Sequence, residues 1–182
     1  MDRSFGPLWK RLSIMVSLIE KAPENELGRT AIMKLCYLLQ TLKHVPLGYR
    51  FRLHNYGPFD TNVLNDLDYA ETVGAIKSQV FAHSRGYRYE LSPDQGAGYV
   101  KKQAGDFVHK HGDALEWVIQ RFGGRSPADL EMISTIIYVD RTAAVTSLEE
   151  IVQRVHIIKP HLDPGAIHSE ARSLLEDGLL ES

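Results

Sequence analysis

Histidine and cysteine are the first residues to consider for metal binding or catalysis. His109 and His111 are two residues apart, so on a helix they point to different faces and form no common metal site. His156, His161 and His168 lie on both sides of a predicted helix break, and no cysteine accompanies them. A His/Asp metal site is one interpretation of this second group, and solvated surface histidines are the simpler one. We therefore expect no metal and no cofactor.

Other patterns that carry catalysis are missing from the sequence. Cys36 is the single cysteine and lies in an apolar helical run, so we expect a buried small hydrophobe and not a nucleophile. The sequence has no G-x-S-x-G, no P-loop and no G-x-G-x-x-G pattern. We therefore expect a protein that is not an enzyme.

The elements of the first half follow from the periodicity of apolar residues. Helical spacing predicts helices over 7–22 and 30–42, the second capped by Thr30. Alternating apolar and polar residues over 49–55 predict a half-buried strand. A third helix is expected from an Asp60 cap to Gly74. Two strand-like runs, 76–81 and 87–91, then predict a β-hairpin.

The second half is predicted to be helical throughout. A segment over 99–122 is loosened by glycines, which indicate either local breaks or close helix packing. Ser126 with Pro127 begins a further helix, Ser147 with Glu150 forms a capping box, and Asp163 begins a last helix.

This order of elements predicts a mainly α (α+β) protein. Helix, strand, helix and hairpin is the order of a winged-helix domain, so we expect a winged-helix-like domain over 1–92 whose hairpin is the wing. We expect it to pack on a C-terminal helical bundle over 93–182, whose last two helices form a second, reduced helix-turn-helix.

The charge is modest overall and uneven along the chain. Formal net charge is −2, which gives no general attraction to nucleic acid or anionic membrane. Residues 1–92 carry 12 Lys and Arg against 9 Asp and Glu, whereas 93–182 carry 9 against 14. The sequence has no apolar run of transmembrane length and no signal peptide, so we expect a cytoplasmic protein with no membrane partner.

The third helix carries carboxylates and no basic residue, which disfavours insertion into a DNA groove because phosphates would repel it. We therefore predict a protein partner that contacts this helix and the wing tip. The predicted contact residues are Asp60, Asn62, Asp66, Asp68, His83, Arg85 and Arg88.

A DNA-binding regulator is the alternative interpretation. Basic residues on the second helix, the strand and the wing would then contact phosphates or a minor groove. These residues are Arg29, Lys34, Arg50, Arg52, Lys77, Arg85 and Arg88. Pairing of these residues with the acidic helix explains them more simply.

Three short motifs resemble one protein family. They are the run from Lys34 to Gln40, the tetrapeptide Tyr56-Gly57-Pro58-Phe59, and Leu64, Leu67 and Gly74-Ala75-Ile76. Together they resemble YwgA-like proteins and the wider Panacea domain of SocA-like antitoxins. The resemblance implies a winged-helix-like scaffold used for protein contact, with a toxin or a protease substrate as partner. A homodimer is also compatible with such a scaffold.

Overall fold

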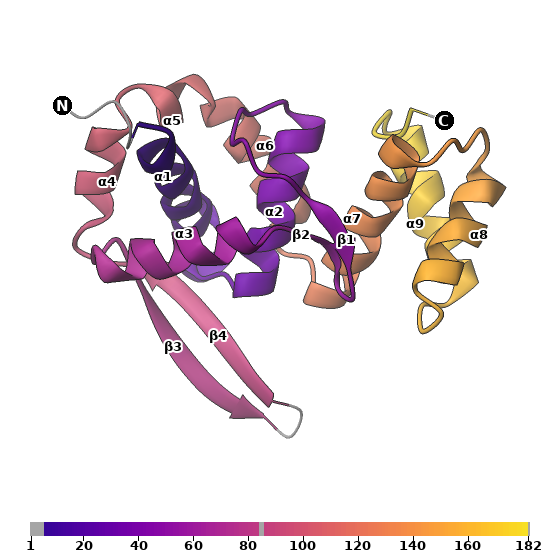
Figure 1. Cartoon of the computed structure of the whole chain (residues 1–182), viewed down its shortest axis with the longest axis horizontal. Coiled ribbons are helices and arrows are strands. Elements are labelled where there is room, and N and C mark those ends of the chain that lie inside the picture. Colours follow the sequence, from indigo (N-terminus) through magenta and orange to yellow (C-terminus); the bar gives the residue numbers. More distant parts are fainter. Residues whose placement is uncertain (1–5, 84–85, 182) are drawn as a thin grey trace. The chain divides into compact units, whose positions relative to one another are not determined.

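The computed structural model describes residues 6–83 and 86–181, and it is mainly helical (Figure 1). The mainly α prediction is therefore confirmed. In chain order the elements are α1 (Gly6–Lys21), η2 (Pro23–Asn25), α2 (Arg29–Leu42), β1 (Arg52–His54), β2 (Gly57–Phe59), α3 (Thr61–Thr72), β3 (Ile76–His83), β4 (Gly86–Pro93), α4 (Ala97–Gln103), α5 (Phe107–Lys110), α6 (Gly112–Phe122), α7 (Pro127–Thr142), α8 (Leu148–Ile158) and α9 (Pro164–Glu176). Within this described part, no helix has both the length and the apolar content that crossing a bilayer requires.

The chain forms two compact units. Unit 1 comprises the chain through Arg50 together with Asp60–Arg125, and unit 2 comprises Phe51–Phe59 together with the chain from Ser126 on. This division differs from the predicted boundary after residue 92, because α4, α5 and α6 pack against α1. The apolar faces of these helices, which periodicity alone leaves unassigned, are buried in unit 1.

Each unit has its own apolar core. In unit 1 the second half of α1 is enclosed on all sides, since α3, α4, α6 and β4 all contact it. Unit 2 is built on α7, whose inward residues meet α8 and α9. The core residues of unit 2 include Leu130, Ile133, Ile136, Ile137, Ile151, Val155, Ile167, Ala171 and Leu174.

Four helices begin at the caps that the sequence predicts. The side chains of Asp60, Ser126, Ser147 and Asp163 accept hydrogen bonds from backbone N–H groups in the first turns of α3, α7, α8 and α9. The predicted cap at Thr30 is wrong, because α2 already begins at Arg29 after Gly28, without a side-chain cap.

The β3–β4 hairpin confirms the predicted pair of strands. Its register pairs Ile76 with Pro93 at one end and His83 with Gly86 at the other. At its base, Leu27 forms an antiparallel bridge with Leu91, with N···O distances of 3.1 and 2.8 Å. A short piece of chain between α1 and α2 therefore extends this sheet by one residue.

The strand predicted over 49–55 is shorter and belongs elsewhere. Only Arg52–His54 is a strand, and it pairs with Gly57–Phe59 in unit 2. Gly57 has φ +86°, and a Cβ there would lie 3.0 Å from Thr135 Oγ1 on α7. The Tyr56 side chain, in the turn between the two strands, is 73% exposed.

The predicted helical segment over 99–122 is broken into α4, α5 and α6. Gly105 has φ +65°, which ends α4 and rules out one continuous helix. Of the two interpretations of these glycines, the structure therefore shows local breaks.

Candidate interaction surface

Asp60 and Asp66 do not lie on the outer face of α3. Asp60 is buried as the helix cap, where Oδ1 accepts from Asn62 N at 2.9 Å and Oδ2 accepts from Arg50 N at 2.6 Å. Asp66 is only 5% exposed and accepts hydrogen bonds from Arg11 and Tyr49. The prediction that these two carboxylates contact a partner is corrected, because both are already bound within unit 1.

Asp66 is the buried member of an ion pair with the half-buried Arg11, and the phenol of Tyr49 binds the same carboxylate. Arg11 Nε lies 2.6 Å from Asp66 Oδ2, and Tyr49 Oη donates to the same oxygen at 2.6 Å. The hydrogen bond with Asp66 raises the pKa of Arg11, and burial raises the pKa of Tyr49 well above its usual value. Arg11 therefore stays charged and Tyr49 stays a hydrogen-bond donor, so the group is suited to holding α1, α3 and the chain at Tyr49 together.

The outer face of α3 is only weakly acidic. Asn62 and Asp68 are exposed, and Asp68 Oδ1 accepts from Arg29 at 2.9 Å. Arg29 also lies 3.6 Å from Glu71 and stacks over the ring of Tyr89, at 4.8 Å from its centroid. Pairing of a basic residue of α2 with the acidic helix, the simpler of the two interpretations, therefore holds for Arg29.

The β3–β4 hairpin exposes apolar side chains to solvent. Val80 is 53% exposed and Tyr87 is 73% exposed, and Phe81 on the opposite face of the hairpin is also exposed. Arg88 pairs with Glu90 and lies over the Phe81 ring at 5.4 Å from its centroid. Figure 1 shows the hairpin extending away from the helices of unit 1. Such apolar groups commonly mark a contact surface.

The tip of the hairpin is only partly described. Arg85, a predicted contact residue in both interpretations, lies outside the described residues. His83 is the last residue of β3. Of the predicted wing-tip residues, Arg88 is therefore the one whose side-chain contacts are described.

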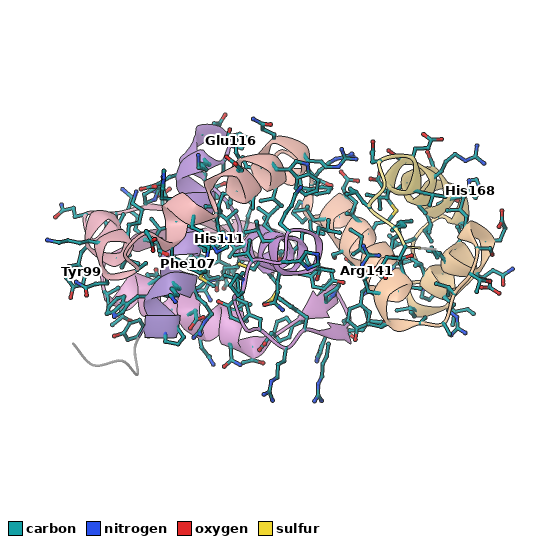
Figure 2. The ribbon with its side chains drawn as sticks, turned by 90° about the horizontal axis from the view of Figure 1, so that it is seen from above. Tyr99, Phe107, His111, Glu116, Arg141 and His168 are labelled. Atoms are coloured by element: carbon teal, nitrogen blue, oxygen red, sulfur yellow. The ribbon has the colours of Figure 1, made fainter. Side chains whose placement is uncertain are left out.

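A second exposed group on unit 1 was not predicted from the sequence. Trp9 packs against Tyr69 and Tyr99, with ring centroids 6.3 and 5.9 Å apart. Tyr99 lies at the surface of α4 (Figure 2). Tyr69 is exposed on α3. The three rings come from helices that are far apart in the sequence. Helical spacing places Trp9 on the apolar face of α1, but it does not predict the contact with Tyr69 and Tyr99.

The basic residues of the DNA-binding alternative are dispersed. Lys34 is buried in α2, so it is not available to a phosphate, and this part of the alternative is corrected. Arg50 and Arg52 are exposed but belong to different units. Lys77 is exposed on β3. Arg88 is exposed on the neighbouring strand, β4. Among the described residues of this set, Lys77 and Arg88 are therefore the pair that is exposed on adjacent strands.

Titratable residues in the part of the chain that the structure describes form no cluster of metal ligands. No group of three or more His, Cys, Asp or Glu side chains there has the arrangement of a metal site. Burial raises the pKa of Cys36, which keeps it a thiol. His111 packs edge-on against Phe107 with centroids 4.6 Å apart, and burial lowers its pKa (Figure 2).

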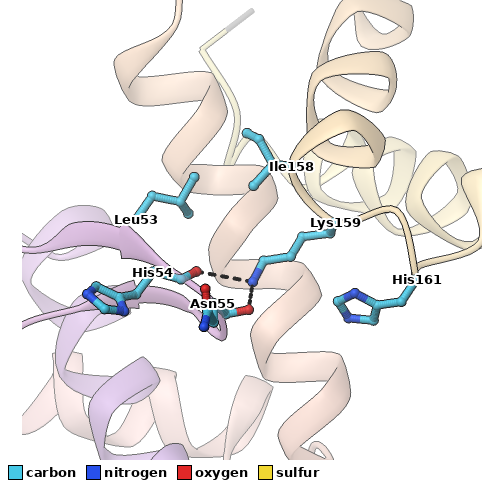
Figure 3. A pocket seen from close by; sticks show the side chains of 6 residues that line it. All are labelled: Leu53, His54, Asn55, Ile158, Lys159 and His161. Carbon is cyan, nitrogen blue, oxygen red and sulfur yellow. Dashed lines mark hydrogen bonds between the residues drawn. The ribbon is translucent and has the colours of Figure 1, made fainter.

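Unit 2 contains a buried lysine whose structural role was not predicted from the sequence. Lys159, just after α8, is 2% exposed and donates to the carbonyl oxygens of His54 and Asn55 (Figure 3). Its Nζ also lies 2.9 Å from Glu131 Oε1 on α7. Lys159 therefore fixes the turn of the β1–β2 hairpin to α7, beside a cavity of about 470 Å³.

A scan against models of protein families and a search of curated proteins each found no match for this chain. The resemblance to YwgA-like and Panacea-domain proteins therefore stays a prediction, and the functional argument rests on the surfaces described above.

Proposed function

We propose that this chain is a non-enzymatic protein-interaction module, an antitoxin-like or adaptor protein whose main contact element is the β3–β4 hairpin. The observation that carries the proposal is the exposure of Val80, Phe81 and Tyr87 on this hairpin. Burying each of these side chains in an interface contributes roughly 1.5–3 kcal/mol. Aromatic residues that lose water in this way commonly dominate binding energies.

A winged-helix-like scaffold is part of the proposal. In such a domain a first strand, between the first two helices, joins the sheet of the wing. Leu27 lies between α1 and α2 and forms a β-bridge with Leu91 of β4. This bridge supports the interpretation of Leu27 as a first strand that is reduced to one residue. Helices α2 and α3 followed by the β3–β4 hairpin supply the rest of the order.

The character of α3 favours a protein over DNA. Its exposed residues are mostly uncharged, and its one exposed carboxylate, Asp68, pairs with Arg29. A reader of the major groove uses basic or amide side chains that reach base edges. The partner is therefore expected to carry an apolar patch that contacts the hairpin. The recovery experiment below identifies whether this partner is a toxin, a protease substrate or a second copy of this chain.

The test compares hairpin variants in partner recovery. The double variant Val80→Ser with Tyr87→Ala should reduce recovery of the partner by about tenfold or more, because it removes the exposed apolar side chains without touching a core. Tyr56→Ala is the matched control, since Tyr56 has the same exposed fraction as Tyr87 but lies in unit 2. Equal recovery with the hairpin variant and the wild type would overturn the proposal.

DNA binding through the hairpin is the second candidate. It is favoured by the exposure of Lys77 and Arg88 on adjacent strands. In that case binding weakens steeply with salt, and Lys77→Ala lowers affinity for all sequences alike.

A further inference from the structure

A groove runs along β1 in unit 2. The cavity of about 470 Å³ is lined by Leu53, His54 and Asn55 on one side and by Ile158, Lys159 and His161 on the other (Figure 3). A second cavity of about 160 Å³ also has Leu53 and Ile158 in its lining, so the two adjoin. The second cavity continues over the end of α7 and along α8. Their combined size is in the range of sites that hold small ligands or short stretches of peptide.

Apolar side chains line the groove and face water. Ile157 is 77% exposed, Ile158 is also exposed, and Leu53 is half-buried between the two cavities. Residues Tyr138 and Val139 of α7 extend this apolar lining. An occupant therefore needs apolar groups spaced along its length.

The charge of the groove is positive. Among the described residues that line the two cavities, the charged or chargeable side chains other than Tyr138 are His54, Arg154, Lys159 and His161, and none is a carboxylate. Glu131 Oε1 offsets the charge of Lys159 and also lies 3.6 Å from His161 Nε2, so the positive charge of the lining rests on Arg154. Arg154 is exposed on α8, and no ion pair of Arg154 occurs within the described ranges. The groove is thus complementary to carboxylates.

The backbone of β1 offers a further means of recognition. Residues of β1 line both cavities, whereas none of the described lining residues belongs to β2. Within the described ranges 6–83 and 86–181, β1 pairs with β2 alone, so its other edge has no strand partner there. Lys159 holds the hairpin turn in place, so this edge is fixed before any ligand binds. An extended chain recognises such an edge through main-chain hydrogen bonds.

From these observations we infer that the groove binds an extended peptide segment of another protein in which apolar side chains alternate with carboxylates. The apolar side chains pack against Leu53, Ile157 and Ile158, and a carboxylate pairs with Arg154. This site lies in unit 2 and is separate from the β3–β4 hairpin of unit 1.

The test uses two pools of labelled peptides of about eight residues. In one pool Leu, Ile and Val alternate with Glu, and in the other Lys replaces Glu. Fluorescence anisotropy with the full chain should show saturable binding of the acidic pool, at least about tenfold tighter than that of the basic pool. Arg154→Glu should weaken binding of the acidic pool by about tenfold, and Ile157→Ser by about fivefold.

Two control variants locate the site. Arg172→Glu changes the charge equally on the exposed face of α9, outside the described lining of both cavities, and should alter affinity by less than about twofold. Tyr87→Ala should leave peptide binding unchanged, which separates this inference from the role proposed for the hairpin. The inference is overturned by no saturable binding, by equal binding of both pools, or by binding that survives both Arg154→Glu and Ile157→Ser.

Discussion

Asp66 and Asp68 are two residues apart on α3, and each pairs with an arginine, yet their surroundings are opposite. Asp66 is buried and binds the half-buried Arg11 and the buried Tyr49, whereas Asp68 is exposed beside Arg29. A buried ion pair that loses one member leaves the other charge without compensation, while an exposed pair contributes little. The two positions therefore form a matched pair for mutation.

Asp66→Ala should lower the free energy of unfolding by about 3 kcal/mol, because Arg11 and Tyr49 Oη lose their acceptor. Asp68→Ala should change it by less than about 1 kcal/mol. Urea unfolding followed through the labelling of Cys36, the single and buried thiol, measures both values in unit 1. Similar values for the two variants would contradict the structural role of the Asp66 group.

The sequence predicts side-chain roles that depend on residues close by in the chain. Asp60, Ser126 and Asp163 were predicted as caps because each accepts a hydrogen bond from an N–H two or three residues further on. The burial of Asp66 was not predictable in this way. It depends on Arg11, which is 55 residues away in the sequence.

At the scale of elements, the tetrapeptide Tyr56-Gly57-Pro58-Phe59 has a role that its sequence suggested only in part. Gly57 has φ +86°, a backbone angle that glycine adopts more readily than other residues. The element it forms is a strand against α7 and not the start of α3. A Cβ at Gly57 would lie within 3.0 Å of Thr135 and 3.3 Å of Ser134 on α7, and these two residues lie nearly 80 positions further along the chain.

Gly57→Ala should lower the free energy of unfolding of unit 2 by at least about 2 kcal/mol, from backbone strain and the close approach of Thr135. Gly178→Ala is the control in the same unit, because Gly178 also has a positive φ of +68° but nothing lies within 4 Å of its Cβ position. It should cost only about 1 kcal/mol. Thermal unfolding by circular dichroism compares the two, and an equal loss would show that contact with α7 is unimportant.

For the whole molecule, the division into units shows what the periodicity of apolar residues does not predict. The presence of the helices and of the β3–β4 hairpin follows from local sequence patterns. The core that each helix joins does not follow from them, because the apolar faces of α4, α5 and α6 could pack against either core, and these helices complete unit 1. The groove of unit 2 likewise combines β1 with α7 and α8, which are far apart in the sequence.

The central claim is that this chain binds a protein and not nucleic acid. Affinity purification of the full chain from its native host at low salt tests it most directly, with the eluate analysed for protein composition and for absorbance by nucleic acid. The account predicts one partner protein in stoichiometric amount and little nucleic acid, because α3 presents no basic side chain and the exposed hairpin is largely apolar. Recovery of DNA that is released as salt is raised, without a stoichiometric protein, would contradict it.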